Sequence, residues 1–213
     1  MRAPVPDPPA AGCARERPKR GYSVAHPPRR GHTPPMTALT PARRASIQCA
    51  ADTLLAGAGA RTIDFGVLLL LCREAGIDVL DADLRDIAGA LRREGEGWRI
   101  YLNREDGPGR RYFTLAHALG HYALHAEEGR AFAESRFTRP LTPGADDGGV
   151  EREANEFAAC LVMPAAMIHA LLAGRPPTER QVVDLSGRCG VSPLAMAHRF
   201  GSLGYAVPLL PTT

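Results

Sequence analysis

Residues 110–125 read RRYFTLAHALGHYALH, and this stretch decides which fold the sequence predicts. His117 and His121 are four positions apart, so a helix would place both imidazoles on one face, one turn apart, where they can bind one metal ion. A tetrahedral zinc site accepts such a pair and leaves two positions for other groups. His125 continues the register, but eight residues of helix rise ~12 Å, so we expect it to pack or to support a ligand. Two core histidines bonded to backbone would show the same spacing.

A third ligand has to come from another element, and the helix expected over Val150–Met163 offers one. Its first turns carry carboxylates at Glu151, Glu153 and Glu156. Glu151 and Asn155 are four apart and share a face, so one could give an oxygen to a metal while the other orients a histidine. The alternative is a solvated acidic first turn that the helix dipole favours.

Two motifs in this order resemble a known family. Tyr112 to His125 resembles the helix "RFTLAHELGHxxLH" of the ImmA/IrrE family of bacterial metallo-endopeptidases. Glu151 to Pro164 resembles that family's second helix, "ExxANxFAxxLLMP". The resemblance extends over roughly Thr40 to Leu203, and the two motifs together are specific.

The resemblance implies one bound Zn²⁺, with His117, His121 and Glu151 as its ligands. Asn155 and His125 would support those ligands without binding the metal themselves. Known members cleave helix-turn-helix repressors and thereby switch on mobile-element or stress-response genes. It therefore implies a cytoplasmic metallopeptidase that regulates transcription, with a helix-turn-helix repressor as its protein substrate or partner.

Ala118 departs from the family pattern, which reads His-Glu-x-x-His. In zincins that glutamate accepts a proton from the attacking water and passes it to the leaving amine, and alanine can do neither. Losing a positioned acid/base costs on the order of 10²–10⁴-fold in rate. We therefore expect weak or absent peptidase activity, unless Asp146, Asp147 or Glu153 substitutes. An engineered Glu→Ala change would give the same sequence as a natural pseudoenzyme.

Two other functions stay open. One is a non-catalytic module, with or without metal, that binds its repressor partner without cutting it. The other is DNA binding through residues 182–203, whose expected helix, turn and second helix follow the order of a helix-turn-helix motif. The second helix of that segment carries only His198 and Arg199 as basic groups, which disfavours a DNA-binding helix. A helical hairpin that packs on the core would show the same sequence pattern.

Composition supports a globular enzyme or binding module. The 213 residues carry a formal charge of +3, but residues 1–36 hold seven Lys/Arg, two acidic residues and nine of the 19 prolines. We expect this basic leader to be disordered, with Met36 as an alternative start. The remainder is near neutral. Five scattered cysteines without a CxxC pair fit a reducing, cytoplasmic location, and no apolar run approaches a membrane span.

The predicted fold class is α+β: a zincin-like core with a small antiparallel sheet, followed by a helical C-terminal region. A hairpin of Ile87–Arg92 and Trp98–Leu102 should lie beside the His117 helix, where an extended substrate could add as a strand. We read residues 129–149 as a connection. The expected domains are the leader 1–36, the core 37–175, a helix-turn-helix-like segment 176–205 and a tail 206–213.

Overall fold

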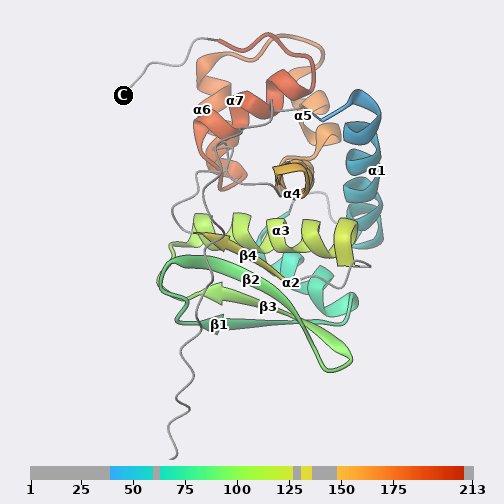
Figure 1. Ribbon diagram of the computed structural model, residues 1–213. Helices are drawn as coiled ribbons and strands as arrows, with labels where there is room; N and C mark the ends of the chain where they lie inside the picture. The colour runs from blue at the N-terminus through green and yellow to red at the C-terminus, as the bar shows by residue number, and fades with distance from the viewer. Residues whose placement is uncertain (1–38, 60–62, 127–130, 136–147, 209–213) are drawn as a thin grey trace, which may run out of the picture. The chain divides into compact units, whose positions relative to one another are not determined.

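The computed structural model describes residues 39–59, 63–126, 131–135 and 148–208. Contacts divide the chain into Met1–Pro35 and Met36–Thr213, and the elements below belong to the second unit (Figure 1). The leader expected over 1–36 lies outside the described residues. The elements in order are α1 (Pro41–Gly57), α2 (Phe65–Glu74), β1 (Ile77–Ala82), β2 (Ile87–Glu94), β3 (Gly97–Asn103), α3 (Pro108–His125), β4 (Phe132–Ser135), α4 (Gly148–Val162), α5 (Ala165–Leu172), α6 (Glu179–Arg188) and α7 (Pro193–Ser202).

This arrangement confirms the α+β class with a helical C-terminal region, and it corrects the expected strand directions. The four-stranded sheet has the order β1-β3-β2-β4. β2 pairs antiparallel with β3 and with β4, whereas β1 pairs parallel with β3. The sheet is therefore mixed rather than antiparallel. The short β1–β2 connection and the β2–β3 hairpin each reverse the chain, so β1 and β3 run the same way.

The hairpin between β2 and β3 follows from its turn residues. Gly95 has φ +62, in the left-handed region that a glycine adopts without steric cost. Trp98 contacts Tyr122 of α3 edge to face, with ring centroids 5.9 Å apart. The expected placement of the hairpin beside the His117 helix is thus confirmed.

Helix α3 lies between the sheet and α4, and α1 packs alongside α4 (Figure 1). The side chains that join these layers are at most 1% exposed. A helix packed on both sides holds its side chains in fixed positions, which matters for the histidines it carries. The joining side chains are Ile100 and Leu102 of β3, Leu115 and Leu119 of α3, and Phe157 and Leu161 of α4.

Side-chain caps set where several helices begin. The side chains of Thr40 and Asp64 cap α1 and α2 and accept hydrogen bonds from Arg43 N and Val67 N. Part of the segment that we read as a connection, 129–149, is instead ordered as β4 and the start of α4. Among the described helices, none alone is long and apolar enough to cross a membrane, although α4 and α5 pass that test together as a pair bent by 51°.

Candidate metal centre

The two histidines of α3 converge on one point inside the protein. His117 is 3% exposed and His121 is 2% exposed. Their Nε2 atoms are 2.9 Å apart, and their ring planes meet at 79°. Both nitrogens therefore face the same small volume, as the spacing of four residues predicts.

Helix α4 brings Glu151 to the same volume. Glu151 Oε2 lies 3.3 Å from His117 Nε2, and Oε1 lies 3.3 Å from His121 Nε2. The Glu151 side chain is 42% exposed, whereas the two imidazoles that it contacts are buried. Within the described part of the chain, this is the only group of three or more His, Cys, Asp or Glu residues whose ligand atoms could hold a metal ion together.

The geometry of this group fits zinc. Tetrahedral zinc with bonds of about 2.0–2.1 Å keeps its ligand atoms about 3.3 Å apart. The two nitrogen–oxygen distances match that separation, the two Nε2 atoms lie closer together at 2.9 Å, and the three atoms all lie within 4.8 Å of one another. Two imidazoles and one carboxylate are also the ligand types found at catalytic zinc sites, which leave a fourth position open.

Asn155 fixes the orientation of the first histidine. Its Oδ1 lies 3.0 Å from His117 Nδ1. If Nδ1 carries the proton and donates to this amide oxygen, Nε2 is left with the lone pair that a metal ligand needs. Asn155 stands one turn after Glu151 on α4, so a single helix face supplies both the carboxylate and the amide.

Burial and hydrogen bonding set the protonation of this group. Burial lowers the pKa of His121, and the neighbouring His117 adds to that effect, which favours the neutral ring. Burial alone would raise the pKa of Glu151, but hydrogen bonds and charge from His117 and His121 hold it well below its usual range. A neutral imidazole and an ionised carboxylate are the forms that bind metal.

Gly120 allows α4 to come close enough to deliver Glu151. A Cβ at this position would lie 3.0 Å from the carbonyl oxygen of Ala154 and 3.2 Å from Cβ of Phe157. These distances are tighter than ordinary van der Waals contact, so only a glycine fits without a shift. The glycine between the two histidines therefore has a packing role that the sequence motif alone does not explain.

Ala118 lines a cavity beside the two histidines. It is 5% exposed, and the cavity holds about 10 Å³, which is room for about one water molecule. Thr114 also lines it, and the hydroxyl of Thr114 is buried with no hydrogen-bond partner among the described residues. No carboxylate borders this cavity within the described part of the chain.

Of the three carboxylates expected as possible substitutes for a general base, the structure describes Glu153, which bonds to Arg43 and His125. Glu153 accepts two hydrogen bonds from Arg43, at 2.7 and 2.5 Å, and also bonds to Nε2 of His125 at 2.9 Å. These bonds engage both carboxylate oxygens, and they lower the Glu153 pKa to about 2. His125 thus lies beside His121, with ring centroids 5.6 Å apart, and bonds to Glu153. Asp146 and Asp147 lie outside the described residues.

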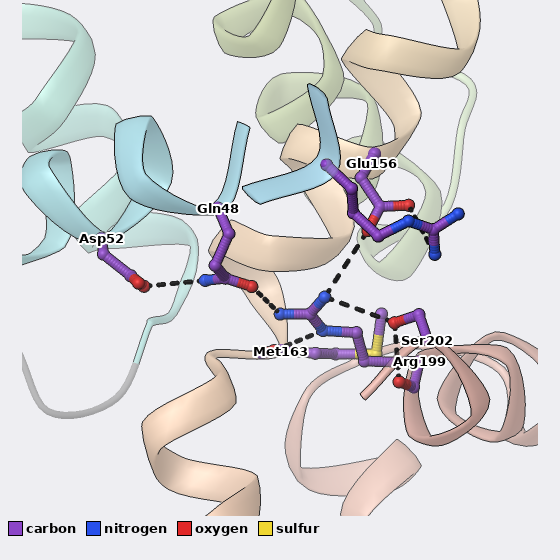
Figure 2. Close-up of polar contacts among 7 residues, drawn as sticks. Gln48, Asp52, Glu156, Met163, Arg199 and Ser202 are labelled. Atoms are coloured by element: carbon purple, nitrogen blue, oxygen red, sulfur yellow. Dashed lines mark hydrogen bonds and ion pairs between the residues drawn. The ribbon is translucent and has the colours of Figure 1, made fainter. Parts of the chain in front are cut away.

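Arg199 is one of the two basic residues on the second helix of the segment considered for DNA binding. Arg199 of α7 is 3% exposed and donates to the carbonyl of Met163 at 3.1 Å and to Gln48 Oε1 at 2.6 Å (Figure 2). It also lies 3.7 Å from Glu156 in an ion pair. Arg199 therefore joins α7 to α1 and α4 and is not available to a phosphate.

A buried histidine pair on one helix, a carboxylate from the next helix and an adjoining mixed sheet describe a metallopeptidase-type fold. The family model described as the IrrE N-terminal-like domain, a peptidase-type family, matches residues 72–200, and the chain belongs to this family. No curated protein matches the sequence significantly.

A solved structure shows the same fold in a longer protein. It is a Mycobacterium tuberculosis transcriptional regulator, with a TM-score of 0.53 and 19% sequence identity. The match covers 74% of this chain and 46% of that chain. The chain therefore spans less than half of the regulator's length.

Proposed function

We propose that this chain binds one Zn²⁺ through His117, His121 and Glu151 and recognises a helix-turn-helix transcriptional repressor. We further propose that it cuts this partner slowly or not at all. One observation carries the proposal: His117, His121 and Glu151 come together as a group that could hold a metal ion, and Ala118, which lines a cavity beside the two histidines, stands at the position of the family's general base. Family membership supports the metal, and the alanine supports the loss of activity.

When bound, Zn²⁺ supplies a Lewis acid that polarises a carbonyl and makes water more acidic. The residues of the chain account for the rest. Asn155 orients the His117 ring, and burial keeps His121 neutral. At position 118 the methyl group of alanine neither accepts a proton from water nor returns one to a leaving amine. The proposed site therefore has metal ligands but no acid/base at position 118.

The regulatory setting has support of its own. The chain belongs to a regulator-related family, and the solved regulator shares its fold. The alternative function is a DNA-binding regulator that acts through residues 182–203. It is disfavoured because Arg199 is buried and bonded to Met163 and Gln48. A repressor protein is therefore the partner that we favour over DNA, and a cytoplasmic location is part of the proposal.

A second candidate function is a pure binding module that sequesters its partner without cutting it. The missing acid/base at position 118 favours this reading whenever residual cleavage is too slow to matter. Both readings predict that the partner is bound, but only the peptidase reading predicts that an added glutamate restores turnover.

The test is Ala118→Glu, assayed by single-turnover cleavage of a helix-turn-helix repressor encoded beside this gene. Both residues favour helix, so the change does not disfavour α3 itself. We expect the rate to rise by about 10²–10⁴-fold, mainly in kcat, because a general base acts in the transition state. Ala123→Glu places the same residue at an exposed position of α3 and serves as the matched control.

Zinc content is matched between the proteins before they are compared. If the native chain already cuts at the rate of Ala118→Glu, the base lies elsewhere and the assignment of position 118 is wrong. If neither protein cuts but both bind the repressor, the binding-module reading replaces the peptidase.

A further inference from the structure

Strand β4 occupies the edge of the sheet next to the candidate metal centre. The register pairs Leu91 with Phe132, Ala90 with Ala133 and Gly89 with Glu134, all antiparallel. An extended partner segment that reached the histidines would need this same edge of β2, because an exposed strand edge supplies the main-chain bonds for strand addition. The chain's own residues already use those bonds.

Phe132 closes the same place with its side chain. Its ring stacks on His121, with centroids 4.0 Å apart and planes 16° from parallel. Phe132 also lines the small cavity together with His117 and Ala118. At about 10 Å³, that cavity has room for about one water molecule and none for a peptide group.

Strand β4 is also weakly anchored. It has four residues, and its pairing with β2 shifts register between Ile87 and Gly89. Phe132 is only partly buried, and Ala131 before it is exposed. A short edge strand of this kind has few bonds to lose when it separates.

We propose that β4 is a built-in closing strand: a partner binds at the metal centre only when its own extended segment displaces β4 from β2. The displacing segment would pair with Gly89–Leu91 and lay an apolar or aromatic side chain over His121 in place of Phe132. This inference rests on the proposed function, because it concerns access to the same zinc site.

The test measures access to the metal with a probe of defined chemistry. Phenylalanine hydroxamate carries a metal-binding group and an aromatic ring, and the Co²⁺-loaded full chain reports its binding by visible absorption. Phe132→Ala should bind the probe about tenfold more tightly, because no aromatic ring has to leave His121 before the probe can bind. Phe113→Ala removes a comparable aromatic ring of α3 that does not line the cavity, and it should bind like the native chain.

A cross-link tests the strand itself. Ala90 and Ala133 are partners in the backbone register of β2 and β4, so Ala90→Cys with Ala133→Cys is the pair chosen to lock β4 onto β2. The oxidised double variant should bind the hydroxamate at least about tenfold more weakly than its own reduced form. Metal content should be equal in all of these proteins.

Different results would overturn different claims. Equal hydroxamate binding in the locked, reduced and Phe132→Ala proteins would overturn the closing-strand inference and leave the zinc site standing. Loss of metal from Phe132→Ala alone would also overturn it, because the ring would then hold His121 in place. Absence of bound metal from the native chain would remove the proposed function and this inference together.

Discussion

At the scale of single residues, the proposed zinc site includes Asn155 as well as its three candidate ligands. The bond from His117 Nδ1 to its amide oxygen fixes the ring so that Nε2 faces Glu151. We predict that Asn155→Ala weakens zinc binding by about 10–100-fold, since partners behind metal ligands typically contribute that much. Competition against a chelator of known affinity at fixed pH measures the change.

Asn155→Asp is the matched control for this prediction. A carboxylate can accept the same hydrogen bond, so this variant should keep most of the zinc affinity. Equal losses in the alanine and aspartate variants would show that Asn155 acts through packing rather than through His117.

How far the sequence predicted these residues depends on how local their geometry is. The convergence of His117 and His121 follows from one helix and its 3.6-residue turn. Glu151 and Asn155 share a face for the same reason, but their placement opposite the histidines rested on the family resemblance. That Arg43 and His125 bind Glu153 was not predicted, because Arg43 is 110 residues away in the chain.

At the scale of elements, the close approach of α3 and α4 places the carboxylate against the imidazoles. We predict that Gly120→Ala destabilises the fold by about 1–3 kcal/mol, because the added methyl group overpacks the contact with Ala154 and Phe157. The same shift should weaken zinc binding, since Glu151 belongs to the displaced helix. Urea unfolding and chelator competition measure the two effects.

Gly187→Ala provides the comparison in a second helix. A Cβ at Gly187 of α6 would meet nothing within 4 Å. This substitution should be neutral or stabilise the protein by about 0.5–1 kcal/mol, because alanine loses less backbone entropy than glycine. If Gly120→Ala were as harmless as Gly187→Ala, the tight helix contact would not be what positions Glu151.

Element boundaries were predicted well in the hairpin, whose strands were expected at Ile87–Arg92 and Trp98–Leu102 and lie at Ile87–Glu94 and Gly97–Asn103. Two features of the sheet were not. The parallel pairing of β1 with β3 depends on which strand becomes the neighbour, and a short alternating run does not specify its neighbour. β4 has four residues and no strong strand pattern, so its pairing with β2 becomes visible only in the folded chain.

At the scale of the whole molecule, Arg199 ties the C-terminal helices to the core that carries the metal centre. Its guanidinium reaches Gln48 of α1, Glu156 of α4 and the carbonyl of Met163 (Figure 2). We predict that Arg199→Ala destabilises the fold by about 3–5 kcal/mol, because it leaves buried polar partners unmatched. Thermal and urea unfolding measure the loss.

Arg180→Ala is the control at the surface. Arg180 is 90% exposed and pairs with Asp184 on the same helix, so its removal should change stability by no more than about 0.5 kcal/mol. If both substitutions changed the free energy of unfolding by a similarly small amount, Arg199 would not be a buried residue that stabilises the packing of α7 on the core. Sequence pattern alone gave no sign of this network, because Gln48 and Arg199 are 151 residues apart.

The central claim is that this chain holds one zinc ion through His117, His121 and Glu151. The most direct measurement is the zinc content per chain, by elemental mass spectrometry, of the native protein and of His117→Ala after identical dialysis. The account predicts about one zinc per native chain, as expected for a site with three protein ligands, and a large loss in His117→Ala. Native protein without zinc, or a His117→Ala variant that retains the native amount, would contradict it.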